Sequence, residues 1–290
     1  MTNEELVIKN RNNKLNETNY NKCGELMRII EYNNAHDIII EFDCSKTTIK
    51  TSYQKFKNGN VKDNFYKSVC GVGYLGNTST SKNKKVKHSY RIWLGMIRRC
   101  YNPRGCYDKM VYYKDCSVCD EWLCYANFEK WYDDNYYEVN NEEMNLDKDI
   151  LVKGNKIYSP NTCIFVPQRI NTLFIKGKGR RGQFPMGVSY DKTRKNFRVC
   201  LSIDRKTKTF SRYKTKEEAF LVYKQAKEKY IKQVADEYKD KIPKRLYDTM
   251  YKYEVEITDW DSPVDQGKEV WEKLFERREI VVWRFIDYIT

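Results

Sequence analysis

The stretch from Asn145 to Asn171, NLDKDILVKGNKIYSPNTCIFVPQRIN, constrains the fold of this chain more than any other. An acidic strand is expected at Leu146–Leu151, followed by a turn that contains glycine. The apolar run Cys163–Val166 predicts a second strand. Pro167 is a favourable first residue for a short helix that carries Asn171. The pattern therefore predicts strand, loop, strand and helix, in that order.

Polar residues stand at intervals along this stretch: Asp147 and Asp149 on the first strand, Asn161 after Ser159-Pro160, and Asn171 on the helix. In this order the stretch resembles the ββα-metal site of the HNH endonuclease family, most closely its phage-type, homing-like members. The resemblance implies that Asp147 or Asp149, together with Asn171, binds Mg²⁺ or another divalent cation. It also implies that Asn161 holds the loop.

The general base of that family, a histidine beside the first aspartate, has no counterpart here. Lys148 or Asp149 occupies its place, and the only histidines are His36 and His88. A lysine with an ordinary pKa near about 10.4 is protonated at neutral pH and is a poor base unless it is desolvated. A desolvated Lys148 and a metal-bound water are the two candidate bases. The resemblance thus supports DNA contact better than it supports cleavage.

Charge is distributed in blocks, and the net charge is +14. Residues 81–99 hold seven basic residues and no acid, residues 115–149 hold eleven acids against two bases, and residues 176–214 hold thirteen bases against two acids. Basic blocks of this kind indicate a polyanionic partner, and double-stranded DNA is the partner we expect. The glycine-rich segment Lys176–Gly182, with Arg180 and Arg181, is either a further phosphate contact or only a tether. The alternative for every block is a solvated face.

Other features exclude some protein classes. No run approaches the roughly 20 apolar residues of a membrane span, and the polar start is unlike a signal peptide, so the expected location is the cytoplasm of a bacterial host cell. Ten cysteines in such a compartment are expected to be reduced thiols. Cys116 and Cys119 have the CxxC spacing of a zinc half-site, but no second CxxC follows. Buried thiols are therefore favoured over structural zinc.

From Gly187 the pattern changes to three strands followed by a long helix. Strand alternation puts Phe197 and Val199 on the face that packs against the helix and turns Arg198 outward. Thr215 with Glu218 three residues later predicts a capping box at the start of the helix.

The Gly187-Val188 start, the Phe197-Arg198-Val199 strand and the run Phe210–Ala226 resemble the plant ethylene-response-factor (APETALA-type) DNA-binding domain. In that family a three-stranded sheet lies in the major groove, and its exposed face contacts DNA. The residues expected to bind DNA here are Arg194, Lys195, Arg198, Arg205, Lys208 and Arg212.

Near the N-terminus, Glu25–Tyr32 and Asp37–Phe42 predict strands, Asn58-Gly59 predicts a tight turn, and Val69–Tyr74 predicts a closing strand. The module is expected to be a small, SH3-sized barrel. A helix with Ser89 as its cap is expected over Ser89–Tyr101, with its apolar stripe in the core.

The expected fold class is therefore modular α+β. The expected domains are an N-terminal β-barrel-like module (1–76), an HNH-like ββα domain (85–175), a sheet–helix DNA-binding domain (183–258) and a helical tail (259–290). The tail is apolar enough to pack on a domain or to form a homo-oligomer.

Three functions stay open. The first is a sequence-recognising DNA-binding protein of the phage HNH endonuclease type that hydrolyses phosphodiesters with a divalent ion if it is active. The second is a catalytically inactive HNH-derived DNA-binding regulator. The third is an anti-defence protein, a phage inhibitor of a host defence complex that acts through protein–protein contacts.

Overall fold

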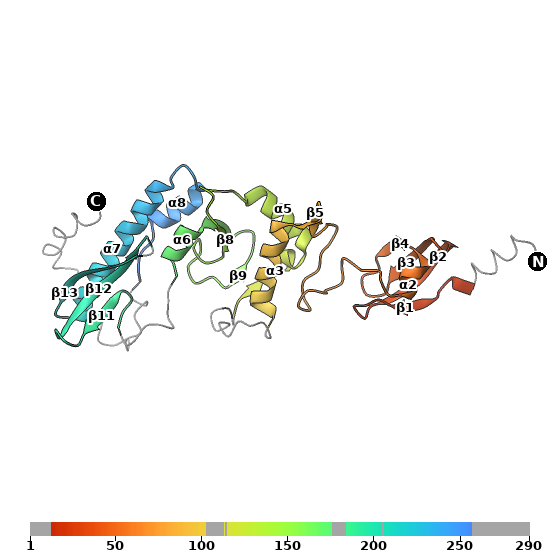
Figure 1. Cartoon of the computed structure of the whole chain (residues 1–290), viewed down its shortest axis with the longest axis horizontal. Coiled ribbons are helices and arrows are strands. Elements are labelled where there is room, and N and C mark those ends of the chain that lie inside the picture. Colours follow the sequence, from red (N-terminus) through yellow and green to blue (C-terminus); the bar gives the residue numbers. More distant parts are fainter. Residues whose placement is uncertain (1–12, 103–112, 114, 176–183, 205, 257–290) are drawn as a thin grey trace, which may run out of the picture. The chain divides into compact units, whose positions relative to one another are not determined.

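The computed structural model describes residues 13–102, 113, 115–175, 184–204 and 206–256, and the described part is mixed α+β with several small sheets (Figure 1). The described residues fall into two compact units. Unit 1 contains the chain up to Tyr136 together with Asn155–Thr162, and unit 2 contains Tyr137–Gly154 and the chain from Cys163 onward. Within the described ranges, no helix combines the length and the apolar character that crossing a bilayer requires.

Unit 1 begins with an antiparallel sheet whose strands are β1 (Thr18–Tyr20), β2 (Leu26–Asn34), β3 (Asp37–Phe42) and β4 (Thr48–Thr51), followed by helix α2 (Tyr53–Lys57). Period-two alternation in β3 buries Ile38, Ile40 and Phe42 completely, and they pack with Phe56 of α2. The strands predicted at Glu25–Tyr32 and Asp37–Phe42 are therefore confirmed.

The predicted barrel is wrong, because the sheet is open, with β1 and β4 at its two edges. The expected closing strand, Val69–Tyr74, is a tight loop with an isolated bridge between Val69 and Gly73. Asn58-Gly59 ends helix α2 instead of joining two strands; Asn58 is its C-cap and Gly59 has a φ of 64°.

The rest of unit 1 contains a short hairpin, three helices and a parallel strand pair: β5 (Ser81–Lys82), β6 (Lys85–Val86), α3 (His88–Tyr101), β7 (Ser117–Val118), α4 (Asp120–Leu123), α5 (Tyr125–Asn135) and β9 (Ile157–Tyr158). The apolar stripe of α3 buries Trp93, Met96 and Ile97, as predicted. Ser89 is not the cap of this helix. Lys87 holds that position, and the Ser89 hydroxyl is buried 2.8 Å from the Tyr125 hydroxyl.

Unit 2 starts with a strand–strand–helix arrangement made of β8 (Met144–Asp147), β10 (Ile164–Pro167) and α6 (Gln168–Leu173). The two strands pair antiparallel, with Asp147 opposite Ile164. Strand β10 is buried along its whole length, which explains the unbroken apolar run in the sequence. The predicted order of strand, loop, strand and helix is confirmed, but the first strand is Met144–Asp147 and not Leu146–Leu151, so Asp149 lies beyond its end.

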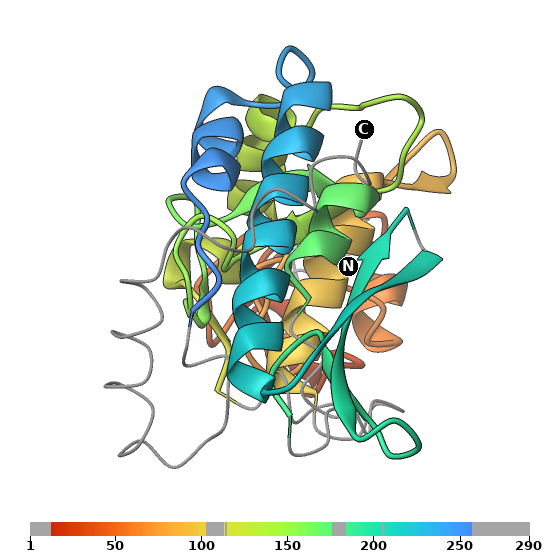
Figure 2. The ribbon, with the colours of Figure 1, turned by 90° about the vertical axis from the view of Figure 1, so that its left-hand side faces the viewer.

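A second sheet and two helices complete the described part of unit 2: β11 (Val188–Asp191), β12 (Asn196–Ile203), β13 (Lys206–Tyr213), α7 (Lys216–Glu237) and α8 (Lys244–Tyr251). Helix α7 lies along one face of the sheet (Figure 2). The Thr215 hydroxyl accepts a hydrogen bond from the Glu218 amide at 3.2 Å, so the predicted N-cap is confirmed. Gly187, at the start of β11, has a φ of 74° and lies against the Tyr223 ring.

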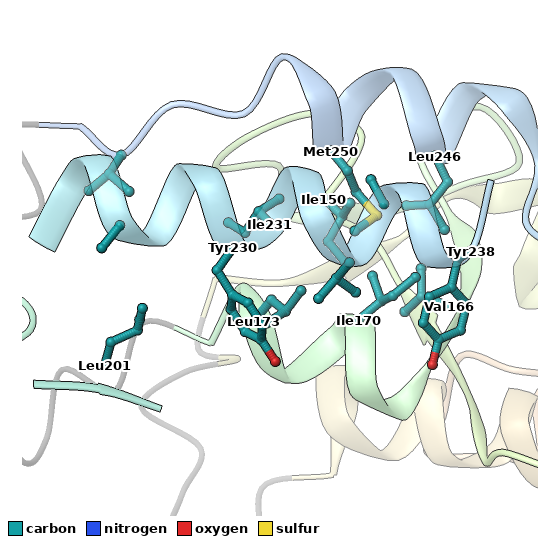
Figure 3. Packing of buried hydrophobic residues seen from close by; sticks show 14 of the residues in the cluster. Ile150, Val166, Ile170, Leu173, Leu201, Tyr230, Ile231, Tyr238, Leu246 and Met250 are labelled. Carbon is teal, nitrogen blue, oxygen red and sulfur yellow. The ribbon is translucent and has the colours of Figure 1, made fainter. Parts of the chain in front are cut away.

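One hydrophobic core joins these two parts of unit 2. Ile150, Val166 and Ile170 of the strand–strand–helix part pack in the same cluster as Tyr230 and Ile231 of α7 (Figure 3). Residues of the predicted 85–175 domain and of the predicted 183–258 domain therefore share a core. The predicted tail, 259–290, lies outside the described residues.

Candidate nucleic-acid interface

The face of the β11–β13 sheet that points away from α7 carries a row of polar side chains. Val199 and Leu201 are buried on the helix side, so Arg198, Cys200 and Ser202 of the same strand point outward. The register places Ser189 of β11 beside Arg198, and Arg212 of β13 on the other side of Arg198. Two arginines thus stand side by side at the centre of this outward face.

The rest of the outward face is built from small polar side chains. Cys200 lies opposite Thr209, and Ser202 lies opposite Thr207. The Cys200 Sγ is 3.6 Å from the Ser189 hydroxyl and 3.9 Å from that of Thr209, and the hydroxyls of Ser202 and Thr207 are 3.5 Å apart. Because no large side chain stands among them, a ligand can approach this part of the sheet closely, with hydroxyl donors within its reach.

The Arg198 guanidinium is only partly satisfied inside the protein. Its Nη1 is 3.9 Å from Asp191 Oδ2, at the limit of an ion pair, and its buried Nε has no hydrogen-bond partner among the described residues. A buried donor without a partner is unfavourable unless a ligand or water accepts from it. The Arg198 side chain is nevertheless 38% exposed, so its terminal nitrogens can reach an external acceptor.

The hairpin between β11 and β12 adds charge beside this face. Asp191 Oδ1 accepts hydrogen bonds from the amides of Thr193 (3.1 Å) and Arg194 (3.2 Å), which closes the turn. Lys195 completes the turn with a φ of 52°. The side chains of Arg194 and Lys195 are exposed at the tip, as the DNA-contact prediction requires.

Lys208, one of the residues expected to bind DNA, does not lie on the outward face with Arg198 and Arg212. It stands opposite Leu201, so it points to the helix side, although it is exposed at the end of the sheet. The cause is a β-bulge, since two residues of β13 oppose Val199 alone. Each extra residue in a strand reverses the faces beyond it, so simple alternation from Arg212 gives the wrong side for Lys208. Arg180, Arg181 and Arg205 lie outside the described residues.

The candidate metal ligands lie on β8 and α6. Asp147 ends β8, and its Oδ1 accepts hydrogen bonds from the amides of Asp149 (2.8 Å) and Ile150 (2.7 Å). Burial, with the Asp149 carboxylate nearby, raises the pKa of Asp147 to about 6. Asn171 is half-buried on α6, and its side-chain amide makes no hydrogen bond to the described residues. Within those residues, no group of three or more His, Cys, Asp or Glu side chains is placed to hold a metal ion.

The two residues predicted to support this site behave differently from each other. Lys148 is buried, and its Nζ is 3.5 Å from Asp149 Oδ2, so the structure gives it a carboxylate partner. Asn161 is exposed, and its side chain makes no hydrogen bond to the described residues. The loop is held instead by Asn155 and Thr162, which both donate to the Ile157 carbonyl, at 2.7 and 3.0 Å. The loop is thus held by the side chains of Asn155 and Thr162, and no side-chain hydrogen bond of Asn161 contributes among the described residues.

The CxxC segment forms a short strand and the start of a helix. Ser117 and Val118 form β7 and pair in parallel with Ile157 and Tyr158 of β9. The amide of Cys119 donates to the Tyr158 carbonyl at 2.9 Å, and Cys119 caps α4.

Sequence reasoning missed the small residues of the outward face, namely Ser189, Cys200, Ser202, Thr207 and Thr209. The alternation of apolar and small polar residues in the sequence of β12 was the pattern that could have predicted them. The chain matches no family model, no curated protein and no solved structure. The resemblances to the HNH and ethylene-response-factor families therefore stay predictions.

Proposed function

We propose that this protein binds double-stranded DNA through the outward face of the β11–β13 sheet. The observation that carries the proposal is the row formed by Ser189, Arg198 and Arg212 on the outward face, in which the Arg198 side chain is 38% exposed. Arginine is the side chain best suited to bidentate contacts with guanine and phosphate. The small hydroxyl-bearing residues beside the row let the sheet approach the DNA closely.

The surrounding charge supports the same partner. Arg194 and Lys195 extend the positive charge to the hairpin tip, and the segment 176–214 has thirteen bases against two acids. The sheet is fixed against α7 by a shared core, so its backbone needs no ordering on binding. A sheet of this kind has the dimensions of the B-DNA major groove.

Fluorescence anisotropy with labelled duplexes tests this proposal. We expect Arg198→Ala and Arg212→Ala each to weaken binding by about tenfold or more, since a good base contact is worth about 1–3 kcal/mol. Lys208→Ala is the matched control, because it removes the same charge from the same strand but from the opposite face. Equal losses in Lys208→Ala and Arg212→Ala would contradict the assignment of the face.

A second candidate function, phosphodiester hydrolysis, is favoured by the position of Asp147. Its carboxylate is oriented by two backbone amides at the end of β8, and Asp149 and Asn171 lie on the adjoining turn and on α6. Carboxylate and amide oxygens are the hard donors that Mg²⁺ prefers, so these three side chains suit such an ion. When bound, the ion would supply Lewis-acid stabilisation of phosphate charge. Lys148, paired with Asp149, would act as a charge partner.

Incubation of supercoiled DNA with Mg²⁺ or Mn²⁺ tests the second function. Nicked or linear product that disappears with EDTA, with Asp147→Ala and with Asn171→Ala would establish hydrolysis. DNA that is bound but stays intact would favour the DNA-binding regulator. DNA that is neither bound nor cut would contradict both proposals and favour a protein partner, such as a host defence complex.

A further inference from the structure

The β5–β6 hairpin of unit 1 has a two-residue turn, and lysines stand both on its strands and in the turn. Ser81 pairs with Val86, and Lys82 pairs with Lys85. The two turn residues, Asn83 and Lys84, have φ values of 51° and 61°. Positive φ at both central positions is the geometry of a type I′ turn, for which Asn-Gly is the favoured sequence. All of these side chains are exposed.

Two features of this hairpin are unfavourable for folding. Lys84 holds the left-handed position that glycine adopts at no steric cost. Lys82 stands directly opposite Lys85, and like charges directly opposite each other on paired strands repel. A sequence chosen for stability alone would place a glycine and an acidic residue at two of these positions.

No carboxylate among the described residues forms an ion pair with Lys82, Lys84 or Lys85. The neighbouring Glu129 is already engaged, because it pairs with Lys87 at 2.8 Å and accepts hydrogen bonds from the hydroxyls of Thr78 and Tyr125. The hairpin lysines thus present unpaired positive charge to the solvent.

The hairpin also borders a shallow depression of about 480 Å³ at the start of α3. Its lining is basic at Lys82, Lys85, Lys87 and His88, and acidic at Glu129 and Asp133. Helix α3 has no acidic residue in its first turn, so the positive end of its dipole adds to the charge there. Arg99, on the last turn of the same helix, lies over the rings of Tyr113 and Tyr158 inside the unit. The exposed positive charge of this basic block therefore lies on the hairpin, at Lys82, Lys84 and Lys85, and along α3, at Arg91 and Arg98.

We propose that the β5–β6 hairpin is a second DNA contact, in which Lys82, Lys84 and Lys85 bind the phosphate backbone of double-stranded DNA. The inference rests on the proposed function and extends it to unit 1. A lysine binds a phosphate as a point charge and does not recognise base edges. This contact therefore adds affinity without sequence preference. The sheet of unit 2 then supplies the base contacts.

Full-length protein with a labelled mixed-sequence duplex tests the inference, over about 50 to 200 mM salt. The hairpin variant combines Lys82→Ala, Lys84→Gly and Lys85→Ala. The control variant combines Lys22→Ala, Lys55→Ala and Lys62→Ala, which removes the same charge from exposed positions elsewhere in unit 1. Each phosphate contact contributes about 0.9 to the slope of log K against log salt. We expect the hairpin variant to lose about 2 to 3 from this slope, and to bind at least about tenfold more weakly than the control variant.

The single variant Lys84→Gly separates binding from folding. Glycine relieves the left-handed backbone, so we expect the melting temperature to rise while DNA affinity falls. A lysine that served only the fold would show the opposite change in stability. A fall in melting temperature with unchanged affinity would therefore overturn the inference.

The outcomes for the two proposals are distinct. If Arg212→Ala weakens binding and the hairpin variant matches the control variant, this inference is overturned and the sheet interface stands. If the hairpin variant alone weakens binding, the inference stands and the sheet interface is wrong. If the wild-type protein does not bind DNA at any salt concentration, both are overturned.

Discussion

Arg169 of α6 binds Asp204 in the turn between β12 and β13. Its Nε and Nη2 lie 3.1 and 3.0 Å from Asp204 Oδ1, and its Nη1 lies 2.5 Å from Glu237 Oε2 at the end of α7. The Tyr230 hydroxyl also donates to Asp204 Oδ1, at 3.1 Å. One arginine thus connects the helix that carries the candidate metal ligand Asn171 to the sheet that carries the candidate DNA-binding face.

This network predicts a moderate effect on stability. We expect Arg169→Ala to lower the free energy of unfolding by about 1–2 kcal/mol, because several partners are lost but all of them are partly exposed. Urea denaturation measures this, with Lys239→Ala as a control that removes an exposed charge just beyond α7. Effects of Arg169→Ala and Asp204→Asn that simply add would show that the pair is not coupled.

Gly187 predicts a much larger effect. A Cβ at this position would lie 2.0 Å from Tyr223 Cδ2, and the backbone φ is 74°. We expect Gly187→Ala to destabilise the protein by about 2–4 kcal/mol, from the clash together with the left-handed backbone. In a Tyr223→Ala background the same substitution should cost clearly less, because the ring is absent. Thermal denaturation of the four proteins would show this coupling, and purely additive losses would contradict it.

Cys200 predicts a chemical test of the outward face. Its thiol lies between the hydroxyls of Ser189 and Thr209, beside the arginine row. We expect alkylation of Cys200 with a bulky maleimide to weaken DNA binding about tenfold or more, because the adduct holds DNA away from the sheet. Bound DNA should in turn slow the alkylation, which mass spectrometry of the peptide would quantify.

Cys200→Ser provides the control for this test. It keeps a small polar side chain, so DNA affinity should stay within about twofold of the wild type and should no longer respond to the reagent at this site. A Cys200→Ser protein that is still inactivated by alkylation would place the sensitive thiol elsewhere.

Glu25 and Asp63 predict a pH-dependent stability of unit 1. Both carboxyl groups are buried, with Glu25 2% exposed and Asp63 7% exposed, and neither Glu25 Oε1 nor Asp63 Oδ2 has a hydrogen-bond partner among the described residues. Burial, together with the Asp63 carboxylate, raises the pKa of Glu25 to about 7. Between the ordinary glutamate value near about 4.3 and this value, only the folded state holds the proton. Stability should therefore fall as the pH rises through this window.

Glu25→Gln should remove that dependence. We expect the variant to melt at a higher temperature than the wild type at about pH 8, where the buried Glu25 must lose its proton, and to show little or no gain at about pH 5. Glu121→Gln, an exposed glutamate of the same unit, is the control. A wild-type melting temperature that does not change between these pH values would contradict the raised pKa of Glu25.

Local patterns in the sequence were sufficient for most individual elements. The apolar stripe of Trp93, Met96 and Ile97 determined the buried face of α3, and Thr215 determined the start of α7. The unbroken apolar run at β10 determined a strand with no exposed face. These features depend on side chains within a few residues of one another, so the sequence alone carries them.

The tertiary structure decided the features that depend on partners distant in the chain. The bulge opposite Val199 put Lys208 on the helix side, and no local pattern marks that extra residue. The Arg169–Asp204 contact and the core shared by α6 and α7 join the segments that the sequence analysis assigned to two separate domains, 85–175 and 183–258. The sequence therefore determined most of the strands and helices that carry the candidate sites. Only packing decided which side chains of unit 2 share a face, because strand register and long-range burial are properties of the assembled core.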